Sequence, residues 1–190
     1  MNIGIDIDGV ILDTEYWFRA YGEIFDIERG GAGVVNPDEL FFQWRLNWSD
    51  ETFCKFKEKY GYDAERNAPL MPCVQMVLEK LKEMGHRLIV ITARGKWGEK
   101  EIEITNETIE KYNLKFDKVY LNVNNKAEIC KAENIDYMID DAYTNIECVS
   151  DAGINCLYFR DVGRKKINRD NVIEVSSWGD IYRFFYNLSK

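Results

Sequence analysis

The sequence predicts an α/β protein: a Rossmann-like parallel sheet of about five strands with helices on both faces, plus a small helical cap inserted after the first strand. Two observations support this prediction. Short runs rich in Val and Ile alternate with longer stretches of helical periodicity, as in chains whose parallel strands are joined by crossover helices. The segment between the first two runs is far longer than one crossover needs, which indicates an insertion with structure of its own.

The expected elements follow in chain order. The apolar runs predict strands at 3–7, 88–92, 119–122, 137–140 and 156–159. Before the second of these, a helix should begin at Pro72, since proline fits a first helical turn, and end at Gly85 as its capping glycine. Further helices are expected at 97–112, 125–133, 144–152 and 178–188.

The inserted segment, 14–67, contains 13 of the 26 aromatic residues and many helix-forming residues, which predicts a small helical cap. Its glycine-rich break at 30–33 is typical of a loop between two helices. The expected domains are therefore a core formed by 1–13 with 68–190, and a cap formed by 14–67.

Composition limits the partners and the chemistry. A net charge of −8 argues against nucleic-acid polymers and anionic membranes, because the overall field repels both. The N-terminus lacks the pattern of a signal peptide, and no apolar run approaches the roughly 18 residues of a membrane span. Five cysteines without a C-x-x-C pair indicate neither a disulfide framework nor a zinc site, so a cytoplasmic location is expected. The single histidine, His86, excludes a histidine-rich metal cage and is interpreted as a turn residue.

Two acids, Asp6 and Asp8, stand at the carboxyl end of the first predicted strand, where open parallel sheets place their ligands. Alternation along the strand sends both side chains to one face, and Gly9 then lets the chain turn away. Such a pair suits a nucleophile beside an acid/base: one carboxylate attacks phosphorus and the other protonates the leaving oxygen. Helix capping is the structural alternative, but two acids beside an apolar strand are costly without a function.

Two further clusters suit a phosphate group. Thr92 and Ala93 follow the second predicted strand, where a hydroxyl and successive backbone N–H groups can hold phosphate oxygens. Lys126 stands at the start of a predicted helix, where a cation is unfavourable unless an anion binds nearby. Each of these two clusters is weak evidence on its own, because Thr is common in strands and Lys is common on protein surfaces.

A second acidic pair, Asp140 and Asp141, ends a later predicted strand. Parallel strands would bring this pair close to Asp6 and Asp8, and the four carboxylates would repel one another unless a cation neutralised them. Carboxylate oxygens without nearby His or Cys are the ligands that Mg²⁺ prefers. The sequence therefore predicts a magnesium site. One such cluster is a weak signal of a phosphate site, whereas four clusters in this order are a specific one.

In these motifs the chain resembles the haloacid dehalogenase-like phosphohydrolases over nearly its whole length. The resemblance implies that Asp6 is a nucleophile that forms an aspartyl-phosphate, and that Asp8 acts as general acid and then as base. It implies that Thr92 and Lys126 hold the phosphoryl oxygens. Dehalogenases also use an aspartate nucleophile but generally lack the second acid, so the presence of Asp8 favours phosphate chemistry.

The resemblance also implies a ligand set for the metal. Asp6, the backbone carbonyl of Asp8 and the later acidic pair would hold Mg²⁺. Asp141 is favoured as the direct ligand and Asp140 as one acting through water, but the family pattern leaves the order of these two open.

The inserted cap and the ending 175–181 are similar to the 5'(3')-deoxyribonucleotidase branch, which implies a nucleoside monophosphate as substrate. Phe41 and Trp44, with Arg94, are the candidates for contacting the leaving group. Aromatic side chains of the cap, including Phe42 and Trp48, would stack on a base or form the core of the cap. The alternatives are a phosphatase for another small phosphorylated metabolite, or a non-catalytic phosphate-binding regulator, which Asp8 and the cap disfavour. The oligomeric state stays open.

Overall fold

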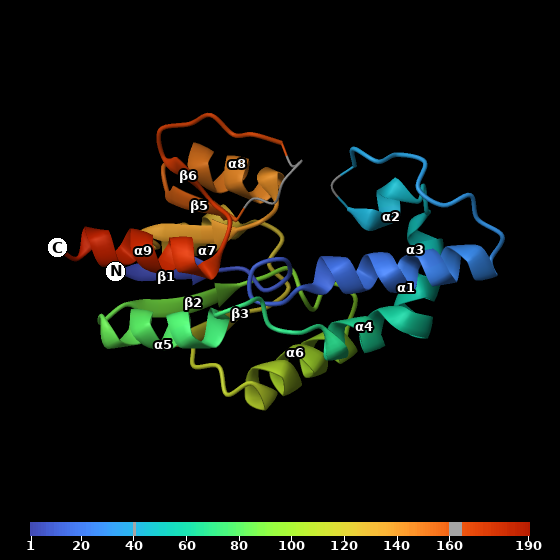
Figure 1. The fold of residues 1–190 in the computed structure, drawn as a ribbon, viewed down its shortest axis with the longest axis horizontal. Helices are drawn as coiled ribbons and strands as arrows, with labels where there is room; N and C mark the ends of the chain where they lie inside the picture. Colours follow the sequence, from blue (N-terminus) through green and yellow to red (C-terminus); the bar gives the residue numbers. More distant parts are fainter. Residues whose placement is uncertain (40, 160–164) are drawn as a thin grey trace. The chain divides into compact units, whose positions relative to one another are not determined.

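The computed structural model describes residues 1–39, 41–159 and 165–190, and the chain forms two compact units. A sheet unit combines Met1–Leu12 with Leu70–Lys190, and a helical unit spans Asp13–Pro69 (Figure 1). These boundaries lie next to those expected for the core and the cap, whereas a capping role for the helical unit remains a prediction. No helix in the described part of the chain has the length and apolar character needed to cross a membrane.

Six parallel strands form the sheet, in the order β3-β2-β1-β4-β5-β6 (Figure 1). Their bounds are β1 Asn2–Ile5, β2 Arg87–Ile91, β3 Lys118–Tyr120, β4 Tyr137–Asp140, β5 Asn155–Phe159 and β6 Val172–Val175. β1 lies between β2 and β4, so the carboxyl ends of these three strands are neighbours. The predicted α/β fold is confirmed, with one strand more than expected.

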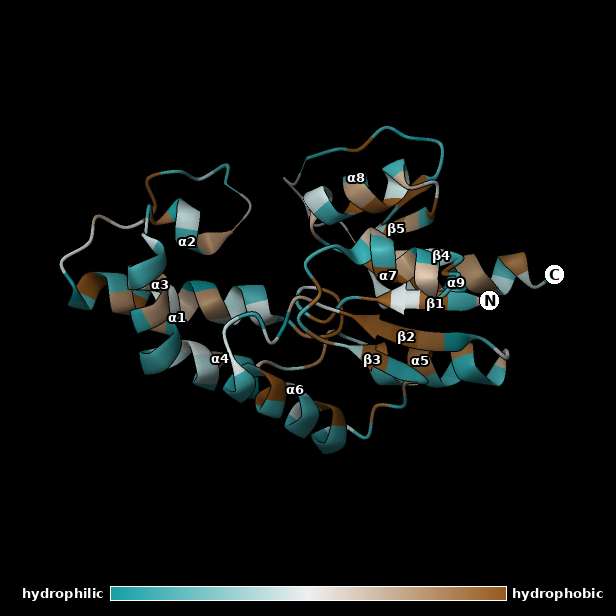
Figure 2. Ribbon diagram, turned by 180° about the vertical axis from the view of Figure 1, so that it is seen from behind, coloured by the Kyte–Doolittle hydropathy of each residue, from teal (hydrophilic) through white to brown (hydrophobic). Residues whose placement is uncertain are grey.

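Helices of the sheet unit form two sets that bury alternate strand residues. They are α5 Val74–Glu83, α6 Glu99–Lys111, α7 Lys126–Ala132, α8 Tyr143–Asp151 and α9 Trp178–Leu188. On one face, Ile89, Ile91 and Met138 belong to a buried cluster with residues of α7 and α8. α5 packs on β2 and against α9. Because both faces are covered, β2 is hydrophobic over most of its length (Figure 2).

Most of the predicted elements are present, and the exceptions have local causes. β6 was not predicted: it is short, stands at the end of the strand order beside β5 and has a half-exposed pattern, so its apolar signal is weak. The helix expected to begin at Pro72 begins at Val74 instead, because Cys73 has a left-handed backbone (φ 68°) that interrupts the helix. His86 lies in the connection between α5 and β2, as expected of a turn residue.

The helical unit is built around aromatic rings. Its elements are α1 Thr14–Glu28, α2 Phe42–Arg45, α3 Asp50–Phe56, a π-helical turn η1 Lys57–Gly61, and α4 Tyr62–Asn67. Phe42, Trp48 and Phe56 are buried and pack edge-on or tilted against one another. Phe41 and Trp44 are instead about half exposed and contact each other, with ring centroids 4.9 Å apart. Phe42 and Trp48 therefore belong to the core of the helical unit, which was one of the two roles considered for these aromatic residues. Phe41 and Trp44 lie on the surface of that unit.

Candidate active site

A tight turn follows β1 and includes Asp6 and Asp8. The Asp6 amide still pairs with the sheet, donating to the carbonyl of Ile139 on β4 (3.0 Å). The carbonyl of Ile7 then accepts backbone N–H groups from three successive residues, Val10, Ile11 and Leu12. These bonds fix the acids at the carboxyl edge of the sheet, next to the end of β4.

Glycine is required in this turn. Gly9 has a left-handed backbone (φ 70°), and a Cβ atom on it would lie 2.2 Å from Oδ2 of Asp141. Only a residue without a side chain lets the turn pass so close to the second acidic pair. The turn is also held from α9, where Trp178 Nε1 donates to the Val10 carbonyl (2.7 Å).

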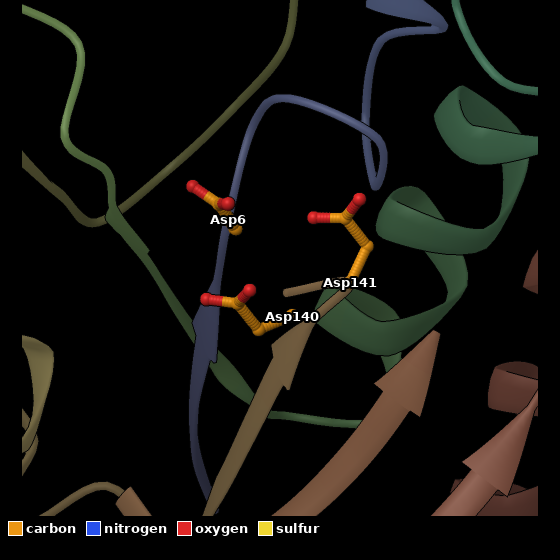
Figure 3. A group of neighbouring side chains, drawn as sticks. All are labelled: Asp6, Asp140 and Asp141. Carbon is orange, nitrogen blue, oxygen red and sulfur yellow. The ribbon is translucent and has the colours of Figure 1, made fainter. Parts of the chain in front are cut away.

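Three carboxylates meet at the edge formed by β1 and β4. Asp6, Asp140 and Asp141 each offer an oxygen atom, and these atoms all lie within 4.8 Å of one another (Figure 3). The side chain of Asp8, the fourth acid expected to converge here, is not in this group among the described residues; it pairs with Arg94 instead.

Lys126 lies between two of these carboxylates. Its Nζ is 2.9 Å from Oδ1 of Asp6 and 2.7 Å from Oδ2 of Asp140, and the residue is buried. Burial alone would lower the pKa of Lys126, but the two carboxylates outweigh it and raise that pKa, so the ammonium stays charged. The helix α7 begins at this lysine because Asn125 caps it, its side chain accepting the Ala127 N–H (3.1 Å).

Asp140 is completely buried and well supplied with hydrogen-bond donors. Besides Lys126, its carboxylate accepts the Ala142 N–H (2.9 Å) and the side-chain amide of Asn145, which lies 3.2 and 3.1 Å from its two oxygens. Asn145 was not predicted as a site residue. An amide in the first turn of the helix that directly follows the acidic pair is the sequence signal that could have identified it.

Burial has the largest effect on the pKa values of the other two carboxylates, Asp6 and Asp141. Burial raises the pKa of Asp6 to about 6, against the opposing effect of Lys126. Burial, followed by the charges of Asp140 and Asp6, raises the pKa of Asp141 well above its usual value. Buried acids with raised pKa values and converging oxygens fit the ligand set of a hard divalent cation, whose charge would reverse both shifts.

Thr92 and Ala93 lie directly after β2, on the other side of β1. Thr92 is buried, its N–H donates to the Tyr120 carbonyl (3.1 Å), and its hydroxyl accepts the Arg94 N–H (3.3 Å). Ala93 is exposed at the same edge. Both residues are thus at the carboxyl end of the strand beside β1, and their role in holding phosphate stays a prediction.

Arg94 is buried and its guanidinium pairs with Asp8 in a bidentate arrangement. Nε lies 2.9 Å from Oδ2, and Nη2 lies 2.7 Å from Oδ1. The sequence predicted a contact between Arg94 and the leaving group, which stays a prediction; the partner that the structure shows is Asp8. Phe41 and Trp44, the other two candidates for that contact, belong to the helical unit.

The chain is similar over most of its length to known hydrolases. A nucleotidase from Clostridium acetobutylicum is 27% identical over 186 residues, which cover 96% of this chain and 92% of the relative. A haloacid dehalogenase-like family hydrolase from Streptococcus pneumoniae superimposes with a TM-score of 0.68 at 18% identity, covering 97% of both chains. A haloacid dehalogenase-like hydrolase from Xanthomonas campestris gives a TM-score of 0.67 at 13% identity, covering 100% of this chain and 96% of that one. No protein-family model matches the chain.

Proposed function

We propose that this chain, which has the haloacid dehalogenase-like hydrolase fold, is a magnesium-dependent phosphatase that hydrolyses phosphomonoesters through an aspartyl-phosphate on Asp6. The observation that best supports this is a buried carboxylate at the carboxyl edge of β1, beside a buried lysine and a second acidic pair. A carboxylate in that position has the ammonium group of Lys126 beside it to orient the phosphoryl group. It also lies at the edge where open parallel sheets bind their ligands.

Each residue then has a chemical task. An Asp6 oxygen attacks phosphorus, the bond between phosphorus and the ester oxygen breaks, and Asp8 gives its proton to the departing oxygen. A water molecule next attacks the phosphorus and transfers a proton to the Asp8 carboxylate. The bond between phosphorus and Asp6 breaks, inorganic phosphate leaves, and Asp6 and Asp8 return to their initial states.

Two features would hold the phosphoryl group during both steps. Lys126 supplies a fixed positive charge 2.9 Å from the nucleophile, and Thr92 with the Ala93 N–H supplies donors at the end of the adjacent strand.

Asp6 and Asp141, with the Asp8 backbone carbonyl, would be the direct ligands of Mg²⁺. Asp140 already accepts hydrogen bonds at both oxygens, from Lys126, Ala142 and Asn145, which supports a role in positioning or contact through water. When bound, the ion would neutralise the facing negative charges of the carboxylates and the phosphate.

A nucleoside monophosphate is the proposed substrate, which makes the enzyme a 5'-nucleotidase. The support is the nucleotidase relative, which is similar over almost the entire chain. Another small phosphorylated metabolite is the second candidate, because the residues at the sheet edge address only phosphate and metal.

The test is a panel of phosphate esters assayed with and without Mg²⁺. It should include 5'- and 3'-nucleoside monophosphates, deoxynucleoside monophosphates and sugar phosphates, with release of inorganic phosphate as the readout. Turnover of a 5'-monophosphate well above that of the sugar phosphates supports the nucleotidase proposal, and the reverse order supports the second candidate. Phosphate binding without turnover of any ester would instead support a non-catalytic regulator and contradict the phosphatase.

A further inference from the structure

The pair of Asp8 and Arg94 joins two segments that are 86 residues apart in the chain. We propose that Arg94 is a positioning residue that fixes the carboxylate of Asp8 for proton transfer. The inference rests on the proposed function, since it assigns Arg94 to the acid/base and not to the phosphate, the metal or the leaving group.

The two partners of the pair differ in how far their side chains are exposed. The Arg94 side chain is 2% exposed, whereas the Asp8 side chain is 40% exposed. The guanidinium therefore lies beneath the carboxylate and Asp8 keeps an accessible side. A planar guanidinium that binds both oxygens fixes the rotation of the carboxylate as well as its location, which a single charge does not.

Arg94 is itself fixed from three directions. Its carbonyl accepts the Asn122 N–H (2.6 Å), its backbone N–H donates to the Thr92 hydroxyl, and its Nη1 lies 3.5 Å from Oγ1 of Thr105 on α6. Thr105 in turn donates to the Glu101 carbonyl (2.8 Å). A buried arginine held by this many groups has little freedom to follow a moving carboxylate, so it defines where Asp8 stays.

Glu101 reinforces the loop that follows Arg94. This buried carboxylate accepts the N–H groups of Gly95 (2.6 Å) and Trp97 (3.3 Å). The loop is therefore anchored to the first turn of α6, the same helix that carries Thr105. The support therefore extends from α6 through Arg94 to Asp8.

Conservative substitutions separate orientation from charge. Arg94→Gln removes the charge and the planar pair of donor nitrogens, while Arg94→Lys keeps the charge but presents its donors from a single nitrogen atom. If Arg94 orients Asp8, both variants should slow phosphoryl transfer from an alkyl ester, with kcat falling about 10- to 100-fold and KM changing less than about threefold.

The leaving group provides a readout that a purely structural role would not change. A nucleoside monophosphate leaves as an alkoxide and needs the proton from Asp8, whereas p-nitrophenyl phosphate leaves as a stable anion and does not. Formation of the phosphoenzyme, measured in a single turnover, should therefore be slowed by Arg94→Gln much more for the alkyl ester than for the p-nitrophenyl ester.

The decisive experiment is a double-mutant cycle with Asp8→Asn, Arg94→Gln and the double variant, each checked for native circular dichroism and melting. If Arg94 acts through Asp8, adding Arg94→Gln to Asp8→Asn should cost less than about threefold in rate. Losses that multiply, or a large rise in KM in Arg94→Gln alone, would show that Arg94 contacts the substrate and would overturn the inference. Arg94→Lys provides the same comparison should Arg94→Gln fail to fold.

The outcomes also separate this inference from the proposed function. A wild-type chain that turned over no ester would overturn both. Losses that multiply in an enzyme that is otherwise active would overturn the inference alone.

Discussion

Two buried aspartates, Asp26 in the helical unit and Asp6 in the sheet unit, differ in their supply of hydrogen-bond donors. Asp26 accepts from Trp48 Nε1 (2.7 Å), the Gly33 N–H (2.9 Å) and Arg29 (2.9 Å). Burial would raise the pKa of Asp26, but these three donors outweigh it and lower that pKa. In the described part of the chain, no donor makes a hydrogen bond of ordinary geometry to Oδ1 of Asp6, although Lys126 is close enough for an ion pair.

The difference separates a structural carboxylate from one available for chemistry. Asp26 has its donors within its own unit and fixes the glycine-rich loop, where a Cβ on Gly31 would collide with it at 2.1 Å. Asp6 and Asp141 keep raised pKa values because burial and the neighbouring carboxylates outweigh the effect of Lys126. A buried acid whose pKa stays raised in the folded protein is a candidate site for an external cation or an electrophile.

The largest expected effect is the loss of activity in Asp6→Asn. Removing the nucleophile should lower turnover by at least about 1,000-fold and abolish the trapped phosphoenzyme. The free energy of unfolding at pH 7 without metal should stay equal or rise, because the raised pKa of Asp6 means that its charge costs stability even beside Lys126. Asp13→Asn, the same substitution at the start of α1, is the control and should keep activity. A marked loss of stability in Asp6→Asn would place Asp6 with Asp26 as a structural acid.

Metal binding should stabilise the protein through the same carboxylates. At a Mg²⁺ concentration of about 100 times the dissociation constant, the free energy of unfolding should rise by about 2.7 kcal/mol. Asp141→Asn should remove most of that rise, while Asp26→Asn should leave it intact. Chelation should abolish turnover and added Mg²⁺ should restore it. Full turnover after exhaustive chelation would contradict the metal site.

Asp26→Asn should destabilise the helical unit by about 1–3 kcal/mol. The new amide places N–H groups where three donors need an acceptor, and at least one of them loses its partner. Denaturant unfolding measures the loss. Asp38→Asn, on the exposed loop of the same unit, is the matched control and should stay within about 0.5 kcal/mol of wild type. Equal effects of the two substitutions would show that the donors around Asp26 contribute little.

The smallest effect expected is a difference of sign in the pH dependence of stability. The folded pKa of Asp26 lies below 3.8, so its contribution is present above that pH and is lost only as the pH falls through the folded pKa. The pKa of Asp6 is about 6 in the folded, metal-free protein and 3.8 in the unfolded chain. Its ionised carboxylate therefore costs stability at pH 7, and this cost disappears as the pH falls from about 6 towards 3.8. Between pH 7 and pH 5 in chelator, the difference in unfolding free energy between wild type and Asp6→Asn should shrink. The difference for Asp26→Asn should stay constant, and parallel curves would contradict the comparison.

The alternation of apolar runs and helical stretches was sufficient to predict the parallel sheet, and strand 137–140 and helix 178–188 were predicted with the bounds that the structure has. The meeting of Asp6 with the second acidic pair was also predictable. Parallel strands end at one edge of a sheet, so acids that follow two such strands are brought together if the strands are neighbours.

Other features depend on which surfaces meet in three dimensions. The chain gives no local signal that Arg94 pairs with Asp8, because that contact follows from the placement of β2 beside β1 and of α6 beneath the loop. The same holds for the aromatic residues of the helical unit: Phe41 and Phe42 are adjacent in sequence, yet one is exposed and the other buried. Sequence pattern predicts the residues available at an edge or on a helix, whereas packing selects the partner of each side chain, because long-range contacts compete for the same surfaces.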